Sequence, residues 1–523
     1  MPIHYPELQL NGLDAAIPAW HGTITEADLL PICQQVSDGG GRLVALWGSD
    51  ERQHNNGFAL HVALVNETGL VCLSLPIPSD ENSPLLNPSY PDLSHIFYAA
   101  NRMQRAVFDL LGIEARGAPD SRPWLRHAAW TDKQFPLRKD FLPASEKSPI
   151  EQDHYPFLQV EGQGVHEIPV GPVHAGIIEP GHFRFSIVGE KVLKLEERLG
   201  YTHKGTEKRF EGMSVQQGAK LAGRVCGDST VAYAWAYAMA AESIAHLTPP
   251  DRAFWLRGLL LERERIANHL GDLGYLGNDV AFSFGFAQFW ILKEQVLRNN
   301  ATLFGHRYLM DSIIPGGVAV DISLEGKALI EQECVLLEEK VHLLRSIYEE
   351  HAGVQDRFIG AGKVEPKLAA QLGLCGLAGR ASAQAWDTRV QFPCAPYHKL
   401  DVQMATYRNG DVAARVIVRF DELFESLRLQ RKILVNLLGA DELARPLETL
   451  PAHQFGVGMV EGWRGEVLVA IHTNAEGKLA RVHPHDPSWQ NWPVLEHAIM
   501  GNIVPDFPLI NKSFNLSYSG HDL

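Results

Sequence analysis

The sequence predicts an α+β protein, with a small N-terminal α/β-sheet domain followed by a mainly α-helical domain that carries a small antiparallel sheet. Three observations support this prediction. Short β-rich runs fill the first 140 residues, long stretches with apolar residues every three or four positions follow residue 200, and strand-like segments return near residue 465. A chain of 523 residues is long enough for two or more folding units, each with its own core.

The N-terminal domain is predicted to span residues 1–142. Residues 42–47, 58–65 and 69–75 are β-rich and separated by Asp, Asn and Gly, which predicts a small antiparallel sheet. Apolar residues at helical spacing predict a helix at 93–111, ended by Gly112, because glycine commonly terminates helices. The polar stretch that follows predicts an interdomain linker at residues 143–165.

The second domain is predicted to span residues 166–523 and to be mostly helical. It opens with two short strands around a Gly/Pro-rich loop at 170–194. In residues 256–270 apolar side chains alternate with charged ones at helical spacing, which predicts an amphipathic helix packed on its neighbours. The complete set of expected helices is 214–246, 252–273, 288–309, 324–352, 381–391 and 411–438, and strands are expected at 465–472 and 479–482.

Composition excludes several classes of protein. Since 47 Lys and Arg stand against 62 Asp and Glu, for a net charge of −15, nucleic acid is an unsuitable partner. No apolar run reaches the roughly 18–20 residues of a membrane span, and the first residues lack the basic and apolar regions expected of a secretory signal. The six cysteines include no C-x-x-C pair, so we expect free thiols and no cluster of this chain's own. These features predict a cytoplasmic protein that reaches a membrane only through other subunits.

Two stretches resemble known families. Residues 103–142, with DLLGI, GAPD and PLRKD, resemble the small hydrophilic subunit of respiratory complex I that lies beside the quinone-reducing subunit. From Gly171 onward, GPVHAGIIEPGHFRF, RVCGDST, LERERIANHLGDLG and EGWRGEV resemble the complex I quinone-site subunit and the large subunits of energy-converting nickel–iron (NiFe) hydrogenases. The order, small subunit then large, resembles the fused large subunit of formate-hydrogenlyase-type enzymes.

The resemblance implies a metal site that this sequence has largely lost. Nickel–iron hydrogenases hold their metals with four thiolates, from R-x-C-G-x-C and from D-P-C-x-x-C near the end. Cys226 matches the first of these ligands, whereas Ser229, Ser517 and Gly520 stand at the other three positions. Because a hydroxyl is a poor donor to these soft metals, we expect no nickel–iron centre and no other metal. Electrons would then arrive from an iron–sulfur cluster in a partner subunit.

The complex I comparison also implies a quinone headgroup pocket. That subunit uses a His on the first β-hairpin loop and a Tyr shortly after an Arg. His182 lies near the expected His and Arg224 matches the Arg, but Gly227 takes the place of the Tyr. A quinone-like pocket formed by His174, His182, Arg224 and Cys226 is therefore possible, with half of the usual headgroup clamp missing.

The polar residues around the lost metal site allow several interpretations. One hypothesis gives Asp228 and His521, together with His182 and Arg224, a role as proton relay in a polar cavity. The alternative is a dead site whose groups only hydrogen-bond one another, in which Cys226 is a small buried hydrophobe. A substitute metal on Cys226, Asp228 and His521 is a third interpretation. Separately, a buried ion network is expected among Glu461, Arg464 and Glu466, with a structural or a proton-path role.

Three functional hypotheses follow. In the first, the chain is the large hydrophilic subunit of a complex-I-like, energy-converting oxidoreductase on the cytoplasmic side of a membrane. It would take electrons from an iron–sulfur small subunit, contact other hydrophilic subunits, and couple redox to ion movement through antiporter-like membrane subunits, with a quinone as one possible acceptor. In the second, it is a non-catalytic subunit that docks the iron–sulfur subunit to the membrane arm. In the third, it is an active hydrogenase with an altered ligand set.

Overall fold

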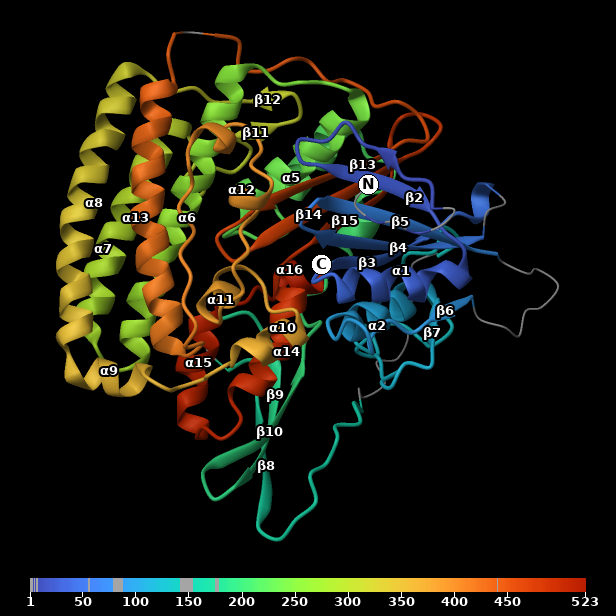
Figure 1. Cartoon of the computed structure of the whole chain (residues 1–523), viewed down its shortest axis with the longest axis horizontal. Coiled ribbons are helices and arrows are strands. Elements are labelled where there is room, and N and C mark those ends of the chain that lie inside the picture. Colours follow the sequence, from blue (N-terminus) through green and yellow to red (C-terminus); the bar gives the residue numbers. More distant parts are fainter. Residues whose placement is uncertain are drawn as a thin grey trace.

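The computed structural model describes residues 3, 5, 8–54, 57–78, 88–141, 154–174, 178–439 and 441–523. Figure 1 shows an N-terminal sheet packed beside a C-terminal sheet, a bundle of long helices to one side, and a three-stranded arm that projects away from both. The α+β fold expected from the sequence is confirmed. No helix among the described residues combines the length and the apolar character needed to cross a membrane.

The N-terminal elements form a mixed five-stranded sheet, a separate parallel pair of strands (β6 and β7) and the helices that flank them. They are β1 Asn11–Gly12, β2 Ala19–Thr23, α1 Glu26–Asp38, β3 Arg42–Asp50, a 3-10 turn Arg52–His54, β4 Phe58–Asn66, β5 Gly69–Ile77, β6 Ser89–Pro91, α2 Ala100–Leu111 and β7 Glu114–Arg116. The strand order is β1-β2-β5-β4-β3, and β2 runs parallel to β5. The antiparallel sheet expected from residues 42–47, 58–65 and 69–75 is confirmed by β3, β4 and β5, and the unpredicted β2 extends it by pairing in parallel with β5.

Helix α2 begins seven residues later than the sequence predicts. The side chain of Asp92 accepts a hydrogen bond from the backbone of Ser94 at 2.8 Å, and Gln104 accepts one from Leu93 at 2.8 Å. Such side-chain bonds offer the backbone an alternative to the helix. The predicted end is confirmed, because Gly112 adopts φ +72° and a Cβ there would lie 2.7 Å from the Phe135 ring.

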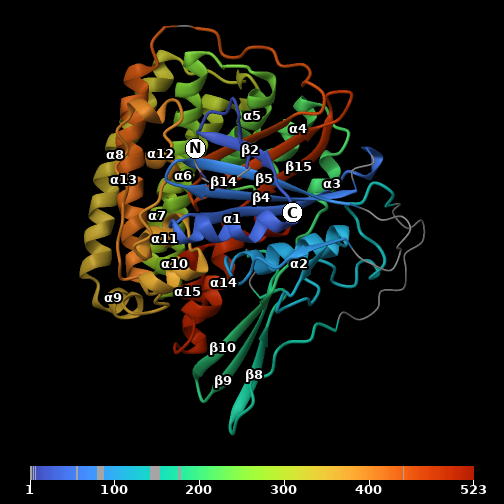
Figure 2. The same cartoon turned by 45° about the vertical axis from the view of Figure 1, so that its right-hand side comes forward.

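The second region opens with a three-stranded arm rather than two strands. Its antiparallel strands, in the order β10-β9-β8, are β8 Val165–Val170, β9 His182–Val188 and β10 Lys191–Arg198. Figure 2 shows this sheet extending below the rest of the molecule. Of the predicted linker, 143–153 lies outside the described residues, and 154–164 contains no helix or strand.

The helices that follow the arm confirm most of the predicted helical segments. They are α3 Thr206–Phe210, α4 Val215–Ala222, α5 Thr230–Ala245, α6 Asp251–Asp279, α7 Ser283–Phe304, α8 Leu324–Glu350, α9 Ala352–Phe358 and α13 Val412–Asn436. The single helix predicted at 214–246 is wrong, because a loop separates α4 from α5. Gly223 and Gly227 lie in this loop, where glycine disfavours a continuous helix.

The helix predicted at 381–391 is also wrong. The chain instead forms three short helices, α10 Pro366–Leu372, α11 Gly376–Ala381 and α12 Thr388–Gln391. Ala383 adopts φ +63°, which no α-helix contains. The side chain of Asp387 then accepts a hydrogen bond from the Arg389 amide at 2.9 Å and starts α12.

The C-terminal sheet lies between the N-terminal sheet and α5 (Figure 1). Its antiparallel strands are β13 Phe455–Glu461, β14 Glu466–Thr473 and β15 Leu479–His485, of which β13 was not predicted. The remaining elements are β11 Ile313–Ile314, β12 Gly317–Val318, 3-10 turns at Tyr397–Lys399 and Val504–Asp506, α14 Ser488–Ala498, α15 Phe507–Phe514 and α16 Ser519–Asp522.

Helix α5 packs unusually close to β13, which yields a stability prediction. A Cβ on Gly458 would lie 2.1 Å from the carbonyl oxygen of Ala236. We expect Gly458→Ala to lower the free energy of unfolding by about 3 kcal/mol, as overpacking does in a dense core. Urea denaturation measures this, with Gly12→Ala as the control because a Cβ there meets no atom within 4 Å. Equal stabilities of the two variants would contradict the close packing.

Candidate functional site

The loop between α4 and α5 meets the C-terminal segment in one buried polar cluster. The thiol of Cys226 donates to Asp228 Oδ1 at 2.9 Å, and its Sγ lies 3.0 Å from Ser517 Oγ. The Gly520 amide donates to Ser517 Oγ at 2.8 Å. Ser229 Oγ lies 3.3 Å from Asp228 Oδ1. The structure therefore brings together the residues at the four positions named by the sequence comparison.

Arg464, which follows β13, occupies the centre of this cluster. Its Nη1 and Nη2 each donate to one carboxylate oxygen of Asp228 at 2.6 Å, and Nη1 lies 3.8 Å from Cys226 Sγ. The Arg464 side chain is 6% exposed and that of Asp228 is 38% exposed. A bidentate ion pair between Arg464 and Asp228 thus lies directly against the Cys226 thiol. The sequence alone did not predict this ion pair.

This ion pair fixes the protonation of its neighbours. Burial raises the pKa of Asp228, but the charge and hydrogen bonds of Arg464 outweigh it and hold that pKa below the usual carboxyl range. Burial, followed by the negative charge of Asp228, raises the pKa of Cys226 above that of an ordinary thiol. Both shifts favour a protonated Cys226 thiol beside an ionised Asp228.

The protonated state of Cys226 can be tested directly. Since the thiolate is the reactive form and Cys226 is 4% exposed, we expect it to resist alkylation by iodoacetamide at pH 8 in the folded chain. Peptide mass spectrometry measures the modification, and the same reaction in urea provides the fully reactive control. Modification in the folded chain as fast as in urea would contradict the proposed protonation.

His521 forms a separate pair next to the cluster. Its Nδ1 lies 2.8 Å from Asp522 Oδ1, and its ring stacks on Trp489 with centroids 4.0 Å apart. Asp522 also accepts hydrogen bonds from the amide and hydroxyl of Thr202, at 2.9 and 2.7 Å. Among the described residues, no hydrogen bond joins His521 to Asp228, so the predicted relay has no direct link. Nor do the described residues contain a group of three His, Cys, Asp or Glu side chains suited to a metal ion.

The predicted quinone-pocket residues do not all come together. Arg224 turns outward and pairs with Asp311, with both nitrogen–oxygen distances 2.7 Å, and its side chain is 42% exposed. His182 starts β9 and lines an open cavity of about 450 Å³, to which neither Arg224 nor Cys226 contributes. His174 contacts the ring of Phe183, with centroids 5.3 Å apart. Burial lowers the pKa of both His174 and His182.

The cavity at His182 has a distinct chemical character. Its walls include the aromatic rings of Tyr155 and Phe157, and Arg184 lies over the Phe157 ring at 4.4 Å. His182 Nε2 is buried without a hydrogen-bond partner, and so is Arg184 Nε. Both atoms lack accessible surface, so the cavity offers a bound ring chiefly its aromatic walls, among them Tyr155 and Phe157.

Most charged residues of α6 lie in the interior of the protein. Glu262, Arg263, Glu264 and Arg265 are all buried, whereas the amphipathic pattern predicts a polar outer face. Glu264 accepts hydrogen bonds from the amides of Val231 and Ala232 at 2.7 and 3.2 Å, and burial raises its pKa to about 8. The helical period locates such residues on one side but does not reveal whether solvent or an ion pair faces them.

The expected ion network in EGWRGEV is divided among separate partners. Glu461 accepts hydrogen bonds from Arg380 at 2.8 Å and from the Thr388 amide at 3.0 Å. Glu466 pairs with Arg42 of β3, while Arg464 pairs with Asp228 as described. Glu461 and Glu466 therefore join distant segments of the chain.

Comparisons with known proteins agree with this architecture. Residues 23–147 match the 30 Kd subunit of respiratory-chain NADH dehydrogenase, and residues 279–455 match its 49 Kd subunit. Formate hydrogenlyase subunit 5 of Escherichia coli K12 is 31% identical over 488 residues, covering 92% of this chain and 85% of that protein. Hydrogenase-4 component G of the same organism is 31% identical over 489 residues, covering 92% and 84%.

More distant relatives include respiratory and hydrogenase-like proteins. An NADH-quinone oxidoreductase subunit of Bacteroides thetaiotaomicron is 27% identical over 420 residues, covering 76% of this chain and 78% of that protein. A chain in the solved structure of the membrane-bound sulfane sulfur reductase, an archaeal respiratory membrane complex, superposes with a TM-score of 0.66 and 25% identity. It covers 69% of this chain and 99% of that one.

The fold and the matches to known proteins together define a complex-I-type, hydrogenase-like oxidoreductase subunit. A region like the 30 kDa subunit precedes one like the 49 kDa subunit in a single polypeptide. The chain belongs to the family of fused 30 kDa and 49 kDa subunits that includes formate hydrogenlyase subunit 5.

Proposed function

We propose that the chain is the large hydrophilic subunit of a complex-I-like, membrane-bound energy-converting oxidoreductase that works without nickel–iron hydrogen chemistry. It would receive electrons from an iron–sulfur partner subunit, bind other hydrophilic subunits, and transmit redox changes to antiporter-like membrane subunits from the cytoplasmic side. The observation that carries this proposal is the Arg464–Asp228 ion pair against the Cys226 thiol. The names of the relatives, which include hydrogenases and a respiratory membrane complex, support the setting.

The residues at the compared positions do not fit a nickel–iron centre. Such a centre requires four soft thiolates, and here one thiol, two hydroxyls and a glycine are available. The thiol is protonated and hydrogen-bonded to Asp228, and the guanidinium of Arg464 lies beside it. A cation at this place would also oppose binding of a divalent metal. We therefore assign no step of the reaction to this metal pair.

We propose a quinone as the acceptor, with the open cavity at His182 as its candidate site. The cavity at His182 has the size usual for small-molecule sites, and its unpaired His182 Nε2 and Arg184 Nε lie among aromatic side chains. Because both atoms lack accessible surface, a bound ring would reach them only after their side chains turn toward the cavity. Arg224 and Cys226, which the sequence comparison places in the pocket, take no part in this site.

The second candidate function is non-catalytic. If the Arg464–Asp228 ion pair and its hydrogen bonds only fill the space that the metal centre occupies in nickel–iron hydrogenases, the chain would serve to dock the iron–sulfur subunit to the membrane arm. Purification of the intact complex through a tag on this chain, with quinone-reduction and hydrogen-uptake assays, separates the candidates. We expect iron–sulfur and membrane subunits to co-purify, quinone reduction to depend on His182, and hydrogen uptake to be absent. Quinone reduction unchanged by His182→Ala would favour the non-catalytic role.

A further inference from the structure

Two rows of side chains face each other where the N-terminal sheet packs on the C-terminal sheet. The first row crosses β2, β5, β4 and β3, and the register pairs His61 with both Ser74 and Trp47. The second row crosses β13, β14 and β15. We call these seven residues the seam: His21, Ser74, His61 and Trp47 in the first row, and Phe455, His472 and His483 in the second.

Ring contacts join the two rows directly. The Trp47 and His483 rings are nearly parallel, with an interplanar angle of 9°. Within the first row, the His61 ring stacks on that of Trp47, with centroids 5.2 Å apart. The ring pairs across the seam have centroids 4.6, 4.7 and 4.9 Å apart: His21 with Phe455, His61 with His472, and Trp47 with His483.

Hydrogen bonds within the seam suit neutral imidazoles. His21 Nε2 and His61 Nδ1 each lie 2.9 Å from Ser74 Oγ, and His61 Nε2 lies 2.8 Å from Ser49 Oγ. Hydroxyl groups can donate to one ring nitrogen and accept from another, so the neutral rings are satisfied. His472 Nε2 is buried without a partner. No carboxylate among the described residues is hydrogen-bonded to His61 or His472.

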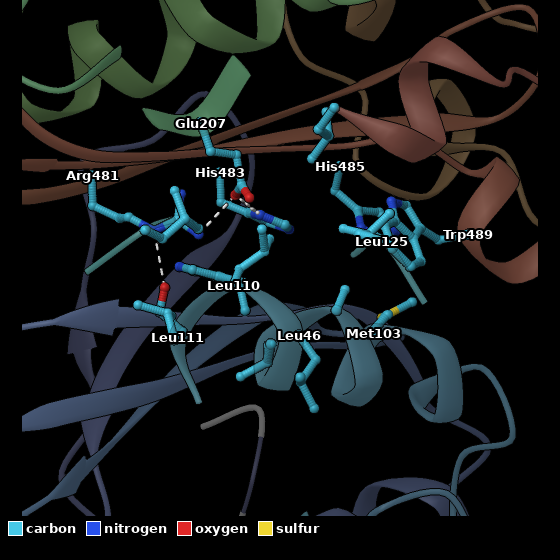
Figure 3. A pocket seen from close by; sticks show the side chains of 16 residues that line it. Leu46, Met103, Leu110, Leu111, Leu125, Glu207, Arg481, His483, His485 and Trp489 are labelled. Atoms are coloured by element: carbon cyan, nitrogen blue, oxygen red, sulfur yellow. Dashed lines mark hydrogen bonds and ion pairs between the residues drawn. The ribbon is translucent and has the colours of Figure 1, made fainter. Parts of the chain in front are cut away.

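The seam has little capacity for added positive charge. Its nearest carboxylate is Glu207 of α3, which lies 2.7 Å from Arg481 and 2.7 Å from His483 Nδ1 (Figure 3). The charge of Glu207 is thus already balanced by Arg481. The titratable and charged groups facing the seam are His21, His61, His472, His483, His485, Cys72, Glu207 and Arg481, with the Arg42–Glu466 pair beside His485.

Beside this charged group lies a small cavity of about 30 Å³. Figure 3 shows Glu207, Arg481 and His483 on one side of it and Leu46, Met103 and Leu110 of the N-terminal region on the other. Because this opposite wall is apolar, it supplies no carboxylate that could compensate a new cation.

We propose that the seam is a proton-sensitive latch between the two fused regions, closed while its imidazoles are neutral and opened when His61 and His472 take up protons from solvent. Burial, and then neighbouring imidazoles and Arg481, lower the pKa of His61, and burial and then His21 lower that of His472 to about 3. Because both shifts are downward, the closed seam is favoured fully above the ordinary imidazole pKa of about 6.5 and progressively less as the pH falls below it.

Cys72 provides a natural reporter of this opening. It lies two residues before Ser74 on β5, so strand alternation places it on the seam face, and it is 2% exposed. Cys33 of α1 and Cys334 of α8, both 0% exposed, report unfolding of the N-terminal region and of the helical bundle. A dipyridyl disulfide, which reacts with thiols in acid, followed by peptide mass spectrometry measures all three in the full chain.

We expect Cys72 to be labelled at pH 5 before Cys33 and Cys334, and all three to be protected at pH 7.5. Removing the proton uptake of His472 by His472→Gln should slow Cys72 labelling at pH 5 by up to about thirtyfold, because pH 5 lies about 1.5 pH units below the ordinary imidazole pKa of about 6.5 and above the folded value of about 3. His61→Gln should also slow it, whereas the exposed His398→Gln should not. Equal labelling of the three thiols, or slowing by none of the seam variants, would overturn the latch. Loss of Cys33 protection at pH 7.5 would show that a glutamine variant does not fold. In that case the order in which the three thiols of the wild-type chain are labelled still tests the latch.

Discussion

Replacing Arg464 with methionine should destabilise the protein by about 2–3 kcal/mol at pH 7. Removal of one partner from a buried ion pair leaves the other uncompensated, which costs about 3–5 kcal/mol when both are fully buried. Asp228 is 38% exposed, so solvent screens part of that cost. Urea denaturation monitored by circular dichroism measures the change.

A double-mutant cycle assigns this loss to the ion pair. Adding Asp228→Asn to Arg464→Met should restore most of the stability, because no charge remains unpaired. The pH dependence has a definite sign. The stabilisation by Arg464 is present above the ordinary Asp pKa of 3.8 and is lost as the pH falls through the depressed pKa of the folded state. Fully additive effects of the two substitutions would show that Arg464 and Asp228 do not act as a pair.

Replacing Arg380 with methionine should have the largest effect, about 3–5 kcal/mol. This guanidinium is 0% exposed and donates to Glu422 at 2.7 Å and to Glu461 at 2.8 Å. Its loss would leave two buried carboxylates without their cation, in a protein whose whole stability is about 5–15 kcal/mol. We expect strongly reduced thermal stability and a sharp drop in folded yield.

The exposed Arg298 provides the matched control. It forms an i,i+4 pair with Glu294 and its side chain is 74% exposed, so Arg298→Met should cost about 0.5 kcal/mol or less. Acid should partly rescue Arg380→Met, since Glu422 and Glu461 can then be neutralised by protons. Equal losses from the two arginine substitutions would contradict the buried network.

The long helices were predictable because their apolar period extends over many turns. The same Ala-rich pattern concealed the break at 223–229, since the residues on both sides favour a helix. The short β1 and β2 carry too few residues for a period of two to be recognised. In α6 the period was detected correctly, but Glu262 and Arg265 lie in the core, because their partners come from distant segments.

The candidate site was predictable only in part. The family resemblance placed Cys226 next to the C-terminal segment, and the contact with Ser517 agrees with it. The role of Arg464 could not be read from the sequence, because it depends on a contact with Asp228 across 236 positions. Likewise, the outward turn of Arg224 depends on Asp311, which no local pattern connects with it. Local periodicity does not encode such long-range pairs.

Nickel analysis of the intact complex, purified through this chain from its native membranes, tests the central claim most directly. With one protonated thiol and an arginine–aspartate pair at the compared positions, we predict iron from partner clusters but no nickel above background. A stoichiometric amount of nickel bound to this chain and lost on Cys226→Ala would contradict the account.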